Sequence, residues 1–410
     1  MNKKSVILSH SGKQHSYHVA DALNKLEFLE KFYTSSYITN LTVQQLVRSA
    51  GLTYLTRRFL PGLGSPHVQS NWKYELKEII YRKLKGNSRK VNDLVFERDM
   101  NFDKSLAKKL DKLNYDIFWG FQGSCFESLK KANKMGKVSV CEMTIAHLPF
   151  TKKILDEEAL FHPDWADSID FTSFPSEYES RLINEPHIAS KVIAISSFLK
   201  QTLVSDSIPE DKISVIPLGF DVHKIPYNEK VESLDNRPLR LLYAGRVTQR
   251  KGIKYLLDAM SAFKTSDVEL HIIGNIHGSG NAFKKYTDSY TYSAGVSQNE
   301  LFKMYGNYDA LVFPSIVEGF GLVTIEAMGA GLPVITTPNT NAMELIRDGE
   351  NGFLIPIRDV HAITEAITRL RNLNDPDFQK MRACARKTAL LYTWQAHQQK
   401  ISEFVDRIKN

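Results

Sequence analysis

The chain has 410 residues, of which 42% are hydrophobic and 24% are charged, a balance typical of a globular protein with room for two domains. No run of eighteen apolar residues occurs, so we expect no transmembrane helix. The three cysteines, Cys125, Cys141 and Cys384, lack metal-ligand spacing and are odd in number, which predicts a reducing, cytoplasmic location.

Positive charge is concentrated in residues 41–93. Ten cations and three acids give this stretch a formal charge of +7, so the rest of the chain is neutral overall. The cations are Arg48, Arg57, Arg58, Lys73, Lys77, Arg82, Lys83, Lys85, Arg89 and Lys90. Apolar residues recur at helical intervals among them, which predicts a basic helical insertion interrupted at Leu60–Pro66.

Three interpretations of this insertion remain open. It can lie on an anionic membrane surface, which would place the protein peripherally on the inner face of the membrane, near a lipid-linked acceptor. It can also present a basic face that is merely solvated. Binding to nucleic acid is the weakest interpretation, because no nucleic-acid motif accompanies the charge.

The first domain opens with a strand at Val6–Leu8, a turn at Gly12 and a helix from Ser16, as in a doubly wound α/β domain. Gly12 is either a point of backbone approach to a phosphate or a plain turn. A later strand, residues 137–144, leads into His147. Loops after strand carboxyl ends bind ligands in open α/β sheets, so we expect His147 to face the cleft, ahead of His10, His15 and His18.

Two further strands, in 191–200 and 212–221, complete the predicted first domain, residues 1–221. Residues 222–238 are polar and contain Pro226 and Pro238, which predicts a linker. The second domain, 239–391, opens with a strand that ends in Gly245 and is followed by Arg246 and Lys251 before a helix. Fixed cations of this kind suit a diphosphate. Arg250 is expected to be solvated.

The most informative stretch is residues 310–336. A short apolar strand stops at Pro314, two glycines follow, and a helix is predicted to begin near Leu322, where free N–H groups favour an anion or a hydroxyl-rich group. Glu318 and Glu326 are eight residues apart and can flank one polar ligand. Each glutamate taken alone could instead be a residue favoured near a helix start or a solvated helix residue.

The combination Glu318-Gly-Phe-Gly with Glu326-Ala-Met-Gly-Ala-Gly-Leu-Pro-Val resembles the paired-glutamate signature of glycosyltransferase family 4. The resemblance implies an α/β chain of the GT-B fold, in which two Rossmann-like domains face a cleft. It also implies that a last helix, within residues 392–410, returns to the first domain.

The resemblance further implies a retaining glycosyltransferase of hexosyltransferase type that moves a sugar from a nucleotide-diphosphate donor, such as a UDP-sugar or GDP-sugar, to a glycan or lipid-linked acceptor in polysaccharide biosynthesis. It implies no metal and no cofactor. Catalytic roles fall to His147, Glu318, Arg246 and Lys251. Donor contacts fall to Gly12, Gly245, Arg246, Lys251, Val296, Glu318, Gly319, Phe320, Gly321, Leu322 and Glu326, with Val296 reading the base. The alternatives are an epimerase or hydrolase of nucleotide sugars on the same fold, or a catalytically silent scaffold partner.

Overall fold

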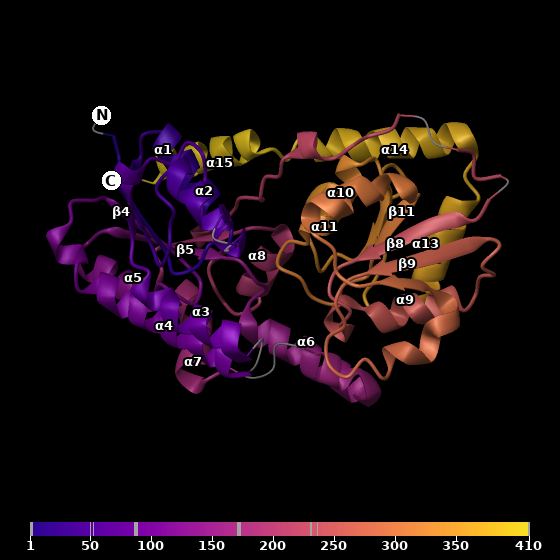
Figure 1. Ribbon diagram of the computed structural model, residues 1–410, viewed down its shortest axis with the longest axis horizontal. Helices are drawn as coiled ribbons and strands as arrows, with labels where there is room; N and C mark the ends of the chain where they lie inside the picture. Colours follow the sequence, from indigo (N-terminus) through magenta and orange to yellow (C-terminus); the bar gives the residue numbers. More distant parts are fainter. Residues whose placement is uncertain are drawn as a thin grey trace.

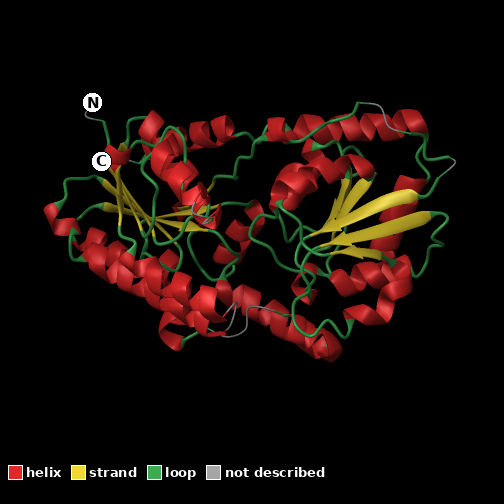
Figure 2. Ribbon diagram, viewed as in Figure 1, coloured by secondary structure: helices red, strands yellow, loops and turns green. Residues whose placement is uncertain are grey.

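The computed structural model describes residues 3–49, 51, 53–85, 89–169, 174–229, 232–235 and 237–408. Two lobes lie side by side, and each is built around a twisted parallel sheet covered by helices (Figures 1 and 2). None of the described helices is long and apolar enough to cross a membrane.

The first lobe contains a seven-stranded sheet in which every neighbouring pair is parallel. Its central strands are apolar runs buried on both faces, as parallel sheets require. In spatial order the strands are β3 (Val68–Ser70), β2 (Leu29–Thr34), β1 (Val6–His10), β4 (Ile117–Phe121), β5 (Val138–Met143), β6 (Lys191–Ala194) and β7 (Ile213–Val215).

The second lobe contains a six-stranded parallel sheet. Its strands in spatial order are β10 (Thr291–Ser293), β9 (Val268–Ile273), β8 (Leu239–Ala244), β11 (Ala310–Phe313), β12 (Val334–Thr336) and β13 (Gly352–Leu354). In both sheets the strand order reverses beside the first strand of the lobe. Ligands of open α/β sheets bind at such a point, beyond the carboxyl ends of the strands.

Helices cover both faces of each sheet (Figure 2). Those that precede the second sheet in the chain are α1 (Ser16–Lys25), α2 (Leu41–Ser49), α3 (Lys73–Lys85), α4 (Arg89–Ala107), α5 (Phe126–Lys134), α6 (Leu148–Phe161), α7 (Ser176–Ile188) and α8 (Ser197–Val204). Those that follow its first strand are α9 (Ile253–Met260), α10 (Gln298–Met304), α11 (Leu322–Gly329), α12 (Ala342–Leu345), α13 (Val360–Arg371), α14 (Asp375–Ala389) and α15 (Trp394–Arg407).

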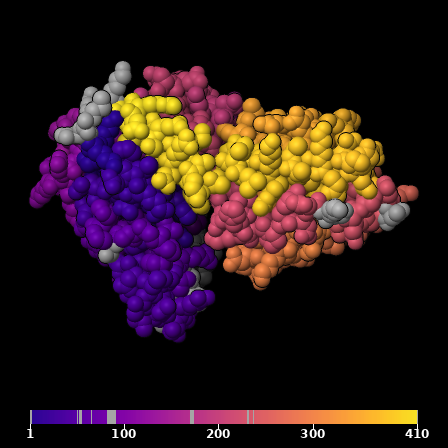
Figure 3. All heavy atoms as spheres, turned by 90° about the horizontal axis from the view of Figure 1, so that it is seen from above, coloured from indigo at the N-terminus to yellow at the C-terminus, as the bar shows by residue number. Residues whose placement is uncertain are grey.

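The last helix, α15, leaves the second lobe and packs on the first, as the resemblance implied (Figures 1 and 3). Thr393 caps it by accepting a hydrogen bond from the Ala396 backbone. Ile401, Phe404 and Val405 on its apolar face are buried in the same core cluster as strand β1. The two lobes are therefore joined by a second crossing of the chain.

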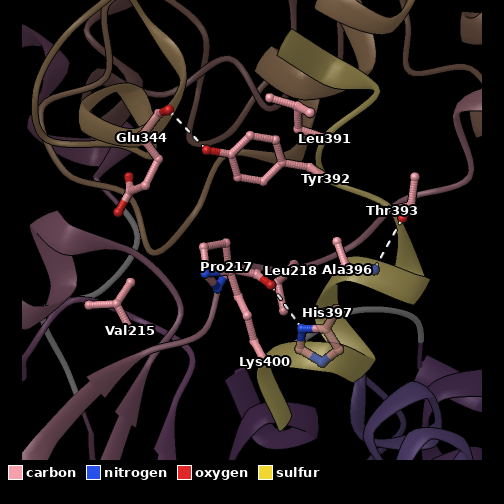
Figure 4. Close-up of a pocket in the computed structure, with 10 residues that line it drawn as sticks. All are labelled: Val215, Pro217, Leu218, Glu344, Leu391, Tyr392, Thr393, Ala396, His397 and Lys400. Carbon is pink, nitrogen blue, oxygen red and sulfur yellow. Dashed lines mark hydrogen bonds between the residues drawn. The ribbon is translucent and has the colours of Figure 1, made fainter. Parts of the chain in front are cut away.

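The chain passes between the lobes twice, once between β7 and β8 and once where it leads into α15, and these two segments touch each other. The Phe220 backbone donates a 3.0 Å hydrogen bond to the Tyr392 carbonyl, and a Cβ on Gly219 would lie 2.7 Å from the Trp394 backbone. Beside this contact is a hollow of about 330 Å³ (Figure 4). Its walls come from β7 and the segment after it, from α12, and from the segment that leads into α15: Val215, Pro217, Leu218, Glu344, Leu391, Tyr392, Thr393, Ala396, His397 and Lys400. The two segments are thus tightly packed against each other at Gly219, and the hollow lies beside this contact.

The basic insertion is not purely helical, which corrects the sequence-based expectation. Residues 68–70 form the edge strand β3, paired in parallel with β2. Three residues, of which two are half-buried and the middle one is exposed, show too little hydrophobic periodicity to be recognised as a strand without the partner strand. The side chains of 82–85, 89 and 90 lie outside the described residues.

Candidate active site

Helix α11 begins at Leu322, at the side of the second lobe that faces the first (Figure 1). Gly321 immediately before it has a left-handed backbone, with φ of 82°, which permits the sharp entry into the helix. The Thr324 hydroxyl oxygen lies 2.8 Å from both the Gly321 carbonyl oxygen and Asn341 Oδ1, and its one proton can be donated to either. The glycine loop is therefore held in one conformation at the start of the helix.

Glu318 in this loop meets the cations of the loop after β8. Its carboxylate forms an ion pair with Lys251 and lies 3.5 Å from Arg250 Nη1. Burial and the neighbouring Arg250 and Arg246 lower the pKa of Lys251, whereas contact with Glu318 favours its charged form. The two predicted site residues Glu318 and Lys251 are thus brought together although they are far apart in the sequence.

Arg250 belongs to this cluster, so the expectation that it is solvated was wrong. Its side chain is largely buried and donates a 3.1 Å hydrogen bond to the Val317 carbonyl. Burial lowers its pKa to about 10. The short segment 246–252 turns back toward the glycine loop, and this turn, which the sequence pattern does not reveal, carries Arg250 inward.

Arg246 lies at the exposed mouth of the same group. Tyr243 donates a 2.7 Å hydrogen bond to its carbonyl, which fixes the backbone at the end of β8. Partial burial, followed by the charge of Arg250, lowers the Arg246 pKa. Gly245, just before it, has a φ of 145° and donates its N–H to the Ile273 carbonyl at 2.9 Å. The charges of Arg246 and Arg250 both lower the pKa of Lys251, so these three cations lie near one another, as binding of a diphosphate requires.

Glu326 is 6% exposed and is not a solvated helix residue. Gln298 Nε2 donates to one of its oxygens at 2.6 Å and the Tyr305 hydroxyl to the other at 3.2 Å. Burial raises the pKa of Glu326. Nothing in the sequence singled out Gln298. It lies two residues after Val296, which is 39% exposed, so its hydrogen bond brings the predicted base-reading loop beside Glu326.

Residues of the first lobe face the cluster of Glu318 and Arg250 across a cavity. A cavity of about 170 Å³ between the lobes is lined by Ile145, Ala146, Thr151, Arg250, Val317, Glu318 and Gly319. A Cβ on Gly319 would lie 2.3 Å from the Thr144 carbonyl, and the Gly319 carbonyl accepts a 2.8 Å hydrogen bond from Ser196. The missing side chain of Gly319 thus allows the two lobes to touch, and its predicted contact with the donor stays a prediction.

His147 does not line this cavity, so the expectation that its side chain faces the cleft was wrong. The side chain is fully buried, and its Nε2 lies 2.8 Å from Asp206 Oδ2. Burial lowers the pKa of His147, and Asp206 opposes this shift. The backbone N–H donates to Thr202 Oγ1, so the start of α6 is pinned against α8 and the ring points into the first lobe. Ile145 and Ala146 reach the cavity in its place.

The remaining predicted residues have different surroundings. Leu322 is 40% exposed, whereas Phe320 is buried and its carbonyl accepts a hydrogen bond from the Asn341 backbone. Gly12 follows β1 in the first lobe, where an added Cβ would lie 3.3 Å from His10 Nε2 and 3.8 Å from Arg98 Nη2. His15 pairs with the buried Glu142.

Two groups among the described residues offer ligand atoms close enough for a metal ion. One is Cys125, Cys141 and Glu185; the other is His147, His187 and Asp206. Neither group includes Glu318 or Glu326, and neither includes the cations Arg246, Arg250 and Lys251. The chemistry that the cleft itself offers is binding of a phosphorylated, hydroxyl-rich molecule by cations, carboxylates and a helix start.

Comparison with known proteins gives the similarities of the chain. Residues 225–389 match the family model described as glycosyl transferases group 1, so this part of the chain is similar to that family. The whole chain has the GT-B fold. It superposes on HepE from Anabaena in complex with UDP with a TM-score of 0.62, at 16% identity and with 99% of this chain and 100% of that chain covered.

Individual relatives agree with this class. An uncharacterized glycosyltransferase of Methanocaldococcus jannaschii is 28% identical over 58% of this chain and 63% of its own length. The capsular polysaccharide biosynthesis glycosyltransferase CapM of Staphylococcus aureus is 31% identical over 45% of this chain and 53% of its own length. The matches thus span little more than half of these curated relatives.

Proposed function

We propose that the protein is a retaining glycosyltransferase of family 4 that transfers a sugar from a nucleotide-diphosphate donor to a glycan or lipid-linked acceptor in polysaccharide biosynthesis. The observation that carries this proposal is the cluster of Glu318 with Lys251 and Arg250 in the loops beside the start of α11, the helix that also carries the buried Glu326. A nucleotide sugar offers a diphosphate to the cations and hydroxyl groups to both carboxylates. UDP and GDP are the nucleotides that we expect the donor to carry.

The cluster suggests a division of roles. Arg246, Arg250 and Lys251 would stabilise the charge that develops on the departing diphosphate, so we expect turnover without a metal ion. Glu326, already accepting two hydrogen bonds beside the loop of Val296, would accept from the nucleoside. Glu318 would accept from the sugar. In the described structure Glu318 neutralises Lys251, and an arriving phosphate would take over this ammonium group.

The acceptor would enter from the first lobe, whose residues Ile145, Ala146 and Thr151 form the facing wall of the cavity. Closing the two walls on a donor would exclude water, which otherwise competes with the acceptor. Attachment to an anionic membrane through 41–93 would bring a lipid-linked acceptor to this wall.

The experiment that tests the function is a donor screen. Binding of UDP, GDP and their sugars is measured by calorimetry, and release of nucleoside diphosphate is followed with and without acceptor extracts. Nuclear magnetic resonance of the product shows whether the anomeric configuration is retained, and activity after treatment with EDTA tests metal independence. Turnover without acceptor would favour a hydrolase or epimerase. Binding without turnover would favour a scaffold, and no binding of any nucleotide would refute the proposal.

A further inference from the structure

Residues 148–168 precede the second lobe in the chain but lie against it. Helix α6 extends from the first lobe along the underside of the second (Figure 1). The short 3-10 turn Pro163–Ser168 that follows contacts the 3-10 turn Gln249–Lys251 of the second lobe. Asp167 accepts a 2.7 Å hydrogen bond from the Ser279 backbone. This segment therefore touches the cationic loop 246–252 directly.

Glu158 is the centre of the contact. Its carboxylate is completely buried, yet it is surrounded by donors from the second lobe. One oxygen accepts 2.7 Å hydrogen bonds from Gln249 Nε2 and the Tyr255 hydroxyl. The other accepts a 2.7 Å hydrogen bond from Arg358 Nε. A buried carboxylate needs such partners, because an unpaired charge in this environment would be strongly destabilising.

The hydrogen bonds continue into the cationic loop. Gln249 immediately precedes Arg250 and Lys251, and its side-chain oxygen accepts a 3.1 Å hydrogen bond from the Lys254 backbone at the start of α9. Its own backbone N–H donates to Ser168 Oγ at 3.0 Å. Thr248 also donates to the Ser168 carbonyl. Glu158 and Ser168 thus hold this loop from outside the second lobe.

We propose that Glu158 is a positioning residue of the donor site, contributed by the first half of the chain, that holds Gln249 so that Arg250 and Lys251 point at the donor diphosphate. The inference rests on the proposed function, because it needs a diphosphate at these cations. Glu158 itself does not touch the donor. Its effect should therefore fall on the phosphate part of the nucleotide and leave the nucleoside part, bound near Glu326, unchanged.

The test uses Glu158→Gln, which keeps the side-chain shape but replaces an acceptor oxygen by a donor NH₂ group. The matched control is Glu157→Gln, the adjacent residue on α6. Glu157 also accepts from Arg358, at 3.0 Å, but its side chain is 40% exposed and, within the described part of the chain, it makes no hydrogen bond or ion pair with the loop 246–252. Calorimetry measures the affinity for whichever of UDP and GDP the wild-type protein binds more tightly. Competition experiments measure the affinity for the matching nucleoside.

We expect Glu158→Gln to bind the diphosphate about fivefold or more weakly, since hydrogen bonds that orient a charged site are lost. We expect nucleoside affinity to change by less than about twofold, and Glu157→Gln to match the wild type in both. Equal loss of nucleoside and diphosphate affinity would overturn the inference, because it would indicate a general structural role. Unchanged diphosphate affinity in Glu158→Gln would also overturn the inference, but it would leave the proposed function standing. A wild type that binds neither UDP nor GDP would overturn both the inference and the proposed function.

A second variant covers the case in which Glu158→Gln does not fold. Ser168→Ala removes only the hydroxyl group that accepts from Gln249, and we expect it to weaken diphosphate binding in the same selective way. Hydrogen exchange gives an independent measure of the loop. Amides of 247–252 should exchange faster in Ser168→Ala than in the wild type, whereas those of β8 should not. Unchanged exchange together with unchanged affinity would overturn the inference.

Discussion

Burial and two neighbouring arginines oppose a positive charge on Lys251 and lower its pKa. Such a group is costly unless an anion compensates it, and in the described structure Glu318 provides that anion. A donor diphosphate would bring more negative charge to the same place. The surroundings of Lys251 are thus suited to exchanging one anion, the Glu318 carboxylate, for another, the donor diphosphate.

The first prediction concerns these cations. Arg246→Ala or Lys251→Ala should weaken nucleotide binding and lower turnover roughly tenfold or more, because each change removes a charge-assisted contact worth about 1.5–3 kcal/mol. Calorimetry on the folded variants checks this expectation. Lys254→Ala is the control, since Lys254 lies on α9 and pairs with Asp258. Affinity equal to that of the wild type in both Arg246→Ala and Lys251→Ala would remove these residues from the site.

The second prediction separates the two glutamates. Glu326→Gln should impair binding of the nucleoside, because it replaces an oxygen that accepts from Gln298 or Tyr305 and is placed to accept from ribose. Glu318→Gln should impair recognition of the sugar while free nucleoside diphosphate still binds. Parallel titrations with nucleoside, nucleoside diphosphate and nucleotide sugar measure the difference. The reverse pattern would contradict these roles.

The third prediction concerns Glu185, a buried carboxyl whose pKa burial raises to about 8. In the unfolded chain this group ionises near pH 4.5. Between these values the folded protein holds a proton that the unfolded chain has lost, so this group makes stability fall as pH rises from about 4.5 to 8 and then level off. Glu185→Gln does not titrate. The difference in thermal midpoint, variant minus wild type, should therefore increase across pH 5–8; a constant difference would contradict the shift.

At the scale of elements, α2 stands apart because none of its residues is buried. Leu41 and Leu46 are 59% and 64% exposed, and Arg48 lies in its last turn. An amphipathic helix with apolar side chains in water and cations nearby is suited to the surface of an anionic bilayer.

The fourth prediction follows from α2. If it lies on a membrane, the wild type should sediment with anionic liposomes at low salt and less at high salt, because each cation near the surface contributes about 1 kcal/mol that salt screens. Leu41→Ser combined with Leu46→Ser should reduce sedimentation and leave nucleotide affinity intact. Leu160→Ser, at an exposed leucine on α6, is the control. Indifference of the wild type to liposomes at low salt would refute membrane attachment and favour a soluble acceptor.

At the scale of the whole molecule, α15 makes the stability of the first lobe depend on the end of the chain. Phe404 is buried against Trp119, with ring centroids 5.4 Å apart in an edge-to-face arrangement. His18 of α1 stacks on Trp394 at 3.7 Å. The first lobe therefore completes its core only when residues from the far end of the chain have returned to it.

The fifth prediction tests this dependence. Phe404→Ala should destabilise the protein by about 3–5 kcal/mol, because it leaves a cavity in the core of the first lobe. Denaturant unfolding followed by tryptophan fluorescence measures the loss, and Glu403→Ala, at a half-exposed neighbour on the same helix, should have little effect. Nucleotide affinity of the folded variant should remain that of the wild type. Equal stability of Phe404→Ala and the wild type would show that the return helix is dispensable.

Much of the fold could be predicted from the sequence because it is encoded locally. The short apolar runs Val6–Leu8 and Ala310–Phe313, each stopped by turn residues, were predicted to be buried strands, and both lie in strands of the parallel sheets. Gly321 and the apolar residues after it define the start of α11, and the spacing of Glu318 and Glu326 follows from this helix. The amphipathic pattern of 394–407 likewise indicates a helix with one face to bury.

Only the tertiary structure decided which side chains meet. His147 follows a strand end as predicted, but the packing of α6 on α8 turns its ring away from the cleft. Arg250 is buried because its loop folds onto Val317, and Glu158 meets Arg358 across 200 residues of chain. Such contacts depend on how two lobes and several loops dock together. Local periodicity reports the conformation of a segment, and the direction of a side chain within the assembled protein is set by partners that lie far away in the sequence.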